Sequence, residues 1–218
     1  SVYICGLGNW GTTDHLTTAE DYISFEIAGV KNVLSGLGIQ GIGPIEEEKF
    51  VELGEKMDII IMDAAAVKNI KPLYAEDKTL FDTCKAWQDG EVYLEMAYNA
   101  YYTNYEIALI NTWFIAKTGY PEIFSDVDMT AKTNEVTKMC LGAELADEIF
   151  ACPSSFGGYG KIDTKTFFNC EKASFWRLFP CRQQKAVVCY KKHAEENPWR
   201  RKISSSFLTA APQHGMRI

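Results

Sequence analysis

The sequence predicts a three-layer α/β sandwich with a mainly parallel sheet flanked by helices, followed by an irregular C-terminal tail. Strand-type segments alternate with segments of helical period along residues 1–168, which is the pattern of parallel-sheet proteins. Of the 218 residues, 47% are hydrophobic, enough for a sizeable core. No apolar run reaches the roughly 18 residues needed to span a bilayer.

The first half of the chain begins with a short strand at residues 2–5. Residues 19–34 carry apolar side chains near the helical period and predict a helix. Pro44 and the three glutamates that follow at 46–48 open the next helix, because carboxylates suit the positive end of a helix dipole. A β-branched run at 58–62 predicts a buried parallel strand.

The second half continues the alternation. The turn at Asp89-Gly90 introduces a strand at 91–95. Residues 103–117 predict a helix, with Thr103 and Glu106 at capping-box spacing. A further helix is expected at 128–141, capped by Gly142, and the glycine-rich loop at 157–160 precedes a last segment at 161–168.

The charges divide the chain near residue 168. Residues 1–168 contain 12 Lys, no Arg and 26 Asp or Glu, a net charge of −14, whereas residues 169–218 contain all five Arg and carry +7. We therefore predict a domain at 1–168 and a separate basic tail at 169–218, explained by a frameshift, a fusion or an accessory segment. The overall charge of −7 argues against a nucleic-acid partner.

Gly6, Gly8 and Gly11 follow the first strand with the spacing of a dinucleotide-binding fingerprint. That fingerprint also needs an amphipathic helix opening at the third glycine, and residues 12–18 offer only Leu16 as an apolar side chain. Three interpretations stay open: a nucleotide site, a loop that lets Trp10 reach a cleft, and a plain connection.

A second loop combines tyrosine and asparagine just before a helix. Tyrosine presents a flat apolar face and a polar tip, which suits a cleft for a bulky, partly polar ligand. The candidate ligand-binding residues are Trp10, Tyr98, Asn99, Tyr101 and Tyr102. The alternative is that the tyrosines belong to the core, as we expect for Tyr105 inside the helix.

Other chemistry has weaker candidates. Asp63 ends a predicted parallel strand, where α/β folds bind ligands, but an N-cap explains it equally well and is preferred. Asp14 and His15 form an isolated pair without metal-ligand spacing, so no metal site is predicted. Residues 1–168 contain no nucleophile-base set or phosphate-binding loop, and we expect no enzymatic activity and no cofactor.

Several segments resemble, in order and spacing, the C-terminal lobe of ABC-transporter substrate-binding proteins of the iron-complex and cobalamin type. The loop at 98–104 resembles a "PYNyyttN" motif, and 157–163 resembles "GGfGKiD". The other matching segments are 2–6 with the glycine-rich loop that follows, 28–33, 43–50, 58–63, 86–93 and 120–128.

This resemblance implies a periplasmic or extracytoplasmic protein that traps a metal chelate, such as a ferric siderophore, haem or a cobalamin, between two lobes. It implies delivery to an ABC permease, without catalysis. In such proteins a surface glutamate of each lobe docks to the permease, and Glu48, with Glu47 beside it, matches that position here.

The resemblance also implies that the N-terminal lobe and the hinge helix have no counterpart in this sequence, and that a leader or lipid anchor lies outside it. Two other functions stay open. One is a nucleotide-binding α/β enzyme using Gly6, Gly8 and Gly11, and the other is an interaction module without solute affinity.

Overall fold

The main sheet confirms the predicted α/β class. The computed structural model describes residues 1–8, 13–99 and 102–169, so the tail beyond lies outside the described residues. In spatial order the strands are β1 (Val2–Cys5), β4 (Ile59–Asp63), β5 (Val92–Glu95) and β6 (Gly160–Lys161). The first three are parallel, and β6 is antiparallel to β5.

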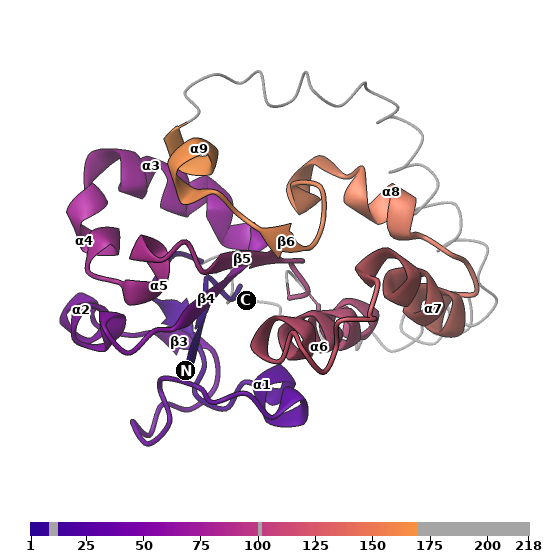
Figure 1. Cartoon of the computed structure of the whole chain (residues 1–218), viewed down its shortest axis with the longest axis horizontal. Coiled ribbons are helices and arrows are strands. Elements are labelled where there is room, and N and C mark those ends of the chain that lie inside the picture. Colours follow the sequence, from indigo (N-terminus) through magenta and orange to yellow (C-terminus); the bar gives the residue numbers. More distant parts are fainter. Residues whose placement is uncertain (9–12, 100–101, 170–218) are drawn as a thin grey trace, which may run out of the picture. The chain divides into compact units, whose positions relative to one another are not determined.

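Helices cover both faces of this sheet, giving the three predicted layers (Figure 1). One face carries α2 (Glu47–Gly54), α3 (Val67–Glu76), α4 (Lys78–Asp82) and α5 (Lys85–Gln88). The other carries α1 (Ile23–Ala28), α6 (Tyr105–Gly119) and α7 (Met129–Leu141). Strand side chains alternate between the two cores: Tyr3 packs toward α2–α5, and Ile4 toward α1 and α6.

Short elements complete the described part of the chain. They are β2 (Thr17–Thr18), β3 (Gly43–Pro44), η1 (Ala64–Ala66), α8 (Ala146–Phe150), η2 (Pro153–Ser155) and α9 (Thr164–Asn169). The antiparallel pair of β2 and β3 links the segment after β1 to the start of α2.

Two predicted caps, at Asp63 and Gly142, are confirmed. The Asp63 carboxylate accepts a hydrogen bond from the backbone N–H of Ala65 at 2.7 Å. Asp128, which was not predicted as a cap, also caps α7 through the N–H of Ala131 at 2.7 Å. Gly142 ends α7 at a φ of +80°, a conformation that glycine adopts without steric cost.

The helix predicted at 19–34 is much shorter. Helix α1 has only six residues, because Gly29 takes a φ of +70° and turns the chain. Val30 and Leu34 are still buried, but as part of the following loop rather than of a helix. The near-helical spacing therefore spans two segments that fold differently, a short helix and a loop.

The predicted start of α6 is also wrong. Asn104 is the N-cap and makes no side-chain cap hydrogen bond, while Thr103 bonds to Asn99 instead. Tyr105, expected in the core, is 79% exposed. Tyr105 therefore faces solvent at the start of α6, whereas Ile107 in the same turn is buried in the core.

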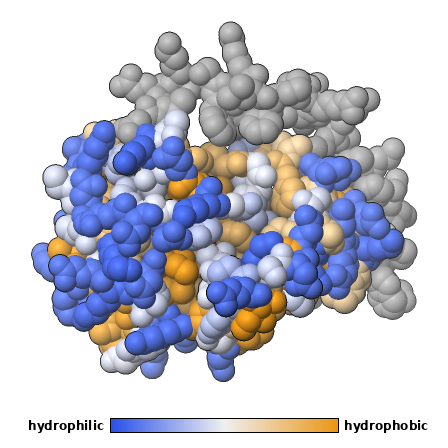
Figure 2. Space-filling view, in the orientation of Figure 1, coloured by the Kyte–Doolittle hydropathy of each residue, from blue (hydrophilic) through white to orange (hydrophobic). Residues whose placement is uncertain are grey.

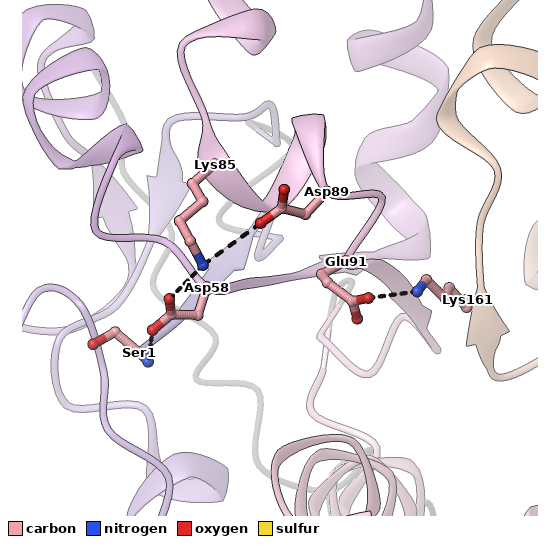
Figure 3. Close-up of polar contacts among 6 residues, drawn as sticks. All are labelled: Ser1, Asp58, Lys85, Asp89, Glu91 and Lys161. Atoms are coloured by element: carbon pink, nitrogen blue, oxygen red, sulfur yellow. Dashed lines mark hydrogen bonds and ion pairs between the residues drawn. The ribbon is translucent and has the colours of Figure 1, made fainter.

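Ion pairs gather at the amino ends of the parallel strands (Figure 3). Asp58, just before β4, binds the α-amino group of Ser1 at 2.7 Å and the Lys85 ammonium at 2.8 Å. Glu91, just before β5, pairs with Lys161 of β6 at 2.6 Å. These partners are partly exposed to water, so each pair contributes little to stability.

His15 is a buried polar residue in the core under α2 and α4. Its side chain is 3% exposed and its ring packs edge-on to Phe50, with centroids 5.0 Å apart. Neither ring nitrogen has a hydrogen-bond partner among the described residues. Burial lowers the pKa of His15.

We predict that His15→Leu gains stability relative to the wild type as the pH falls from about 7 to about 5. The unfolded wild type binds a proton below about pH 6.5 that the folded state resists, so acid costs stability only when the histidine is present. Urea unfolding at a series of pH values measures the difference. Parallel pH profiles of the two proteins would contradict this prediction.

Candidate functional site

The carboxyl ends of three neighbouring strands meet at one edge of the sheet. Strands β1, β4 and β5 run parallel and pair in register, so the segments that leave them start side by side. In open α/β sheets ligands bind outside this edge. We call it the carboxyl edge: residues 6–8 after β1, 63–66 from the end of β4, and 95–99 from the end of β5.

The two loops singled out in the sequence contact each other at the carboxyl edge. The side-chain amide of Asn99 donates a hydrogen bond to the backbone oxygen of Gly8 at 2.8 Å. A Cβ on Gly8 would lie 2.3 Å from the backbone oxygen of Asn99. Only glycine allows this approach, so the glycine-rich loop and the tyrosine loop are packed together.

Gly6 is needed at the same edge for a similar reason. Its φ is +82°, and a Cβ there would lie 2.1 Å from the Cβ of Ala66 in η1. The loop after β1 therefore touches the segments after both β4 and β5. The Gly6 N–H donates to the backbone oxygen of Thr17, and the Gly6 oxygen accepts the Thr13 hydroxyl.

The structure separates the predicted ligand-binding residues. Tyr98 is 8% exposed, and its ring centroid lies 6.2 Å from that of Tyr22. Asn99 is half-buried against Gly8, whereas Tyr102 is 80% exposed. Trp10 and Tyr101 lie outside the described residues. Their roles as ligand contacts stay predictions.

Sequence reasoning missed Glu95, the last residue of β5. It is fully buried and accepts a hydrogen bond from the Tyr22 hydroxyl at 3.0 Å. Burial and the neighbouring charge of Asp63 raise the pKa of Glu95 well above its usual range. The sequence feature that could have revealed Glu95 is a carboxylate at the end of an apolar strand. Asp63 has the same position at the end of β4.

Capping accounts for only one of the two carboxylate oxygens of Asp63. One carboxylate oxygen accepts the N–H of Ala65, and the other is buried without a partner in the described residues. Burial raises the pKa of Asp63 to about 7. An N-cap at the surface would have its second oxygen in water.

The predicted docking glutamates lie on a different element. Glu47 and Glu48 are in the first turn of α2, and both are exposed, as is Glu46 ahead of them. Figure 2 shows a largely hydrophilic surface over α2, α4 and α5. Exposed acidic charges of this kind can steer a basic partner toward the start of α2.

The nucleotide-binding interpretation lacks its structural context. In the described segment 13–22 the chain forms a turn and the short strand β2, with no helix. The fingerprint requires a helix there, whose N-terminus would point at a pyrophosphate.

Away from the carboxyl edge, the described residues offer little for a binding site. Within 1–8, 13–99 and 102–169, no three His, Cys, Asp or Glu side chains are grouped to hold a metal ion. In the same ranges none of the helices has the length and apolarity needed to cross a bilayer.

A surface hollow of about 630 Å³ is lined by Val51, Glu52, Glu55, Thr83, Lys85 and Gln88. It lies beside the ion pairs at the amino ends of the strands.

Two solved structures similar to this chain are periplasmic binding proteins. One is the molybdate-binding protein MolA of Haemophilus influenzae with molybdate bound, at 22% identity and a TM-score of 0.48, covering 63% of this chain and 40% of MolA. The other is the TroA-like protein FepB of Veillonella parvula, at 20% identity and a TM-score of 0.44, covering 62% of this chain and 43% of FepB.

This chain therefore spans about two-fifths of the length of either protein. No protein-family model matches the sequence. No curated protein matches it either.

We predict that Gly8→Ala lowers the free energy of unfolding by about 1–3 kcal/mol, because its Cβ forces the Asn99 backbone away. Gly160→Ala is the matched control, since a Cβ there meets no atom within 4 Å. Denaturant unfolding of both variants measures the difference. Equal losses in the two variants would show that the contact between the two loops is not a tight one.

Proposed function

We propose that this chain is part of the solute-binding component of an ABC importer and forms one lobe of a two-lobed trap. The solute class proposed is a metal chelate such as a ferric siderophore, haem or a cobalamin. The protein would act in the periplasm or at the extracytoplasmic surface and deliver its solute to a membrane permease. No catalysis is part of this proposal.

The observation that carries the proposal is the contact between the two loops at the carboxyl edge. The segments that resemble the binding-protein lobe include residues 6–8 and 98–99, which are distant in sequence and joined by the Asn99–Gly8 hydrogen bond. A ligand lying over this edge would meet both loops at once. Closure of a second lobe over it would supply the switch between open and closed states.

Tyr102 provides an accessible test, because the residue is 80% exposed. We expect Tyr102→Ala to weaken solute binding up to about tenfold, the value of one aromatic contact. Isothermal calorimetry with a ferric hydroxamate, haem and cyanocobalamin measures it. Met139→Ala is the control, because Met139 is 70% exposed on α7.

The absence of binding by all three solutes would count against the proposed function, also when a second lobe from a related binding protein is supplied on the same chain. A solute that binds with the same affinity to the wild type and to Tyr102→Ala would support solute binding but exclude Tyr102 as a contact.

The docking role predicts an effect of charge at the start of α2. Glu48→Lys reverses one exposed charge, and we expect at least tenfold weaker binding to an ABC permease in nanodiscs at low salt. The effect should shrink above about 0.15 M salt, where exposed charges are screened beyond about 8 Å.

Glu76→Lys is the matched control for this experiment. Glu76 is exposed at the end of α3, so the variant has the same net charge with the change elsewhere. Equal weakening by both variants would show a general charge effect and would refute docking through α2.

A further inference from the structure

Asp63 and Glu95 occupy register-paired positions on adjacent parallel strands. Side chains alternate along a strand, and Ile61 and Tyr93, two residues earlier, both pack on the α1 and α6 face. Asp63 and Glu95 therefore lie side by side on that same face of the sheet. The electrostatic effect of Asp63 on Glu95 agrees with this closeness.

The hydrogen bonds of these two carboxyl groups are incomplete. Both side chains are 0% exposed. Oδ1 of Asp63 accepts the N–H of Ala65, and Oε1 of Glu95 accepts the O–H of Tyr22. Oδ2 of Asp63 and Oε2 of Glu95 have no partner among the described residues. Two buried ionised carboxylates in this state would be strongly unfavourable.

No positive group balances the pair in the described part of the chain. The ion pairs found there involve neither Asp63 nor Glu95. The titratable groups that act on the pair come from β1, the segment before α1, the loop after β5 and the segment before β6. They are Cys5, Tyr22, Tyr98 and Tyr159.

Each of these four groups is neutral or negative, never positive. From α6, the side chain that reaches this cluster is Asn111, which accepts the O–H of Tyr159 at 2.7 Å. A neutral amide supplies no charge. With the groups that the structure describes, the remaining way to neutralise two adjacent buried carboxylates is to bind a proton or a cation.

We propose that Asp63 and Glu95 share a proton at neutral pH, as a carboxyl–carboxylate pair that fastens the carboxyl edge of the sheet. One protonated carboxyl donates its O–H to the other carboxylate, using the two oxygens that otherwise have no partner. Burial, which raises the pKa of both groups, supports this arrangement.

The proton-sharing pair connects to both loops of the carboxyl edge. Asp63 caps η1, whose Ala66 packs against Gly6. Glu95 holds Tyr22, whose ring lies beside Tyr98. Loss of the shared proton places two like charges under these loops, so folding and the geometry of this edge become linked to pH. This inference does not depend on the proposed solute.

Proton linkage gives the direction in which the stability of the fold changes with pH. The folded pair holds at least one proton at pH values where the unfolded carboxyls, with pKa values near 4, have lost theirs. Stability therefore falls as the pH rises from about 5 to about 7, and the folding equilibrium constant decreases about tenfold per pH unit for each retained proton.

The test compares the wild-type chain with Glu95→Gln and Asp63→Asn, whose amides can donate the missing hydrogen bond without a titrating proton. We expect the ratio of the folding constants, variant over wild type, to rise up to about tenfold per pH unit between pH 5 and 7. The opposite contribution of His15 is common to all proteins and cancels in this ratio. Glu91→Gln is the control: it lies at the other end of β5, is paired with Lys161, and should leave the ratio constant.

Infrared spectroscopy of the wild type keeps the proposal testable if the variants fail to fold. We expect a carbonyl band from a protonated carboxyl at pH 7 that disappears on unfolding in denaturant. Its absence, or a constant ratio of folding constants, would overturn the proposal. Stabilisation by Na⁺ or Ca²⁺ at pH 8 that depends on Glu95 would also overturn it, because a cation would then neutralise the pair.

Discussion

The parallel register of β4 between β1 and β5 is the constraint on which the rest of the structure depends. It places the ends of three buried strands at one edge, so the loops that follow them must pack against one another. It also forces the terminal residues of β4 and β5, Asp63 and Glu95, into neighbouring positions on one face. A shift of one residue would turn one carboxylate to the opposite core and separate the pair.

The carboxylates at the amino ends of the strands and those at the carboxyl ends differ in exposure and in their partners. At the amino ends Asp58 and Glu91 have cationic partners and contact water, so their ion pairs are weak but inexpensive. At the carboxyl ends Asp63 and Glu95 are buried, and neither forms an ion pair among the residues that the structure describes. The hydrophobic cores on both faces must therefore offset an electrostatic penalty that falls entirely on the edge carrying the candidate site.

Local patterns in the sequence predicted the elements whose signals are local. The apolar run that ends at Asp63 and the glutamates at the start of α2 can each be recognised within a few residues, and both elements are present. The prediction of a helix at 19–34 was wrong, because the spacing of apolar residues does not show that Gly29 adopts a positive φ. Glu95 was missed because its significance depends on Asp63, 32 positions earlier, and only the strand register brings the two together.

The glycines after β1 show what a short motif can establish. A glycine pattern after a strand indicates that another group approaches the backbone too closely for a Cβ. It does not identify that group. In a nucleotide-binding protein that group is a phosphate. Here the described neighbours are the side chain of Ala66 and the backbone of Asn99. The same physical requirement therefore joins the loops of the carboxyl edge to each other, and any ligand must bind over loops already packed together rather than into the space that the glycines create.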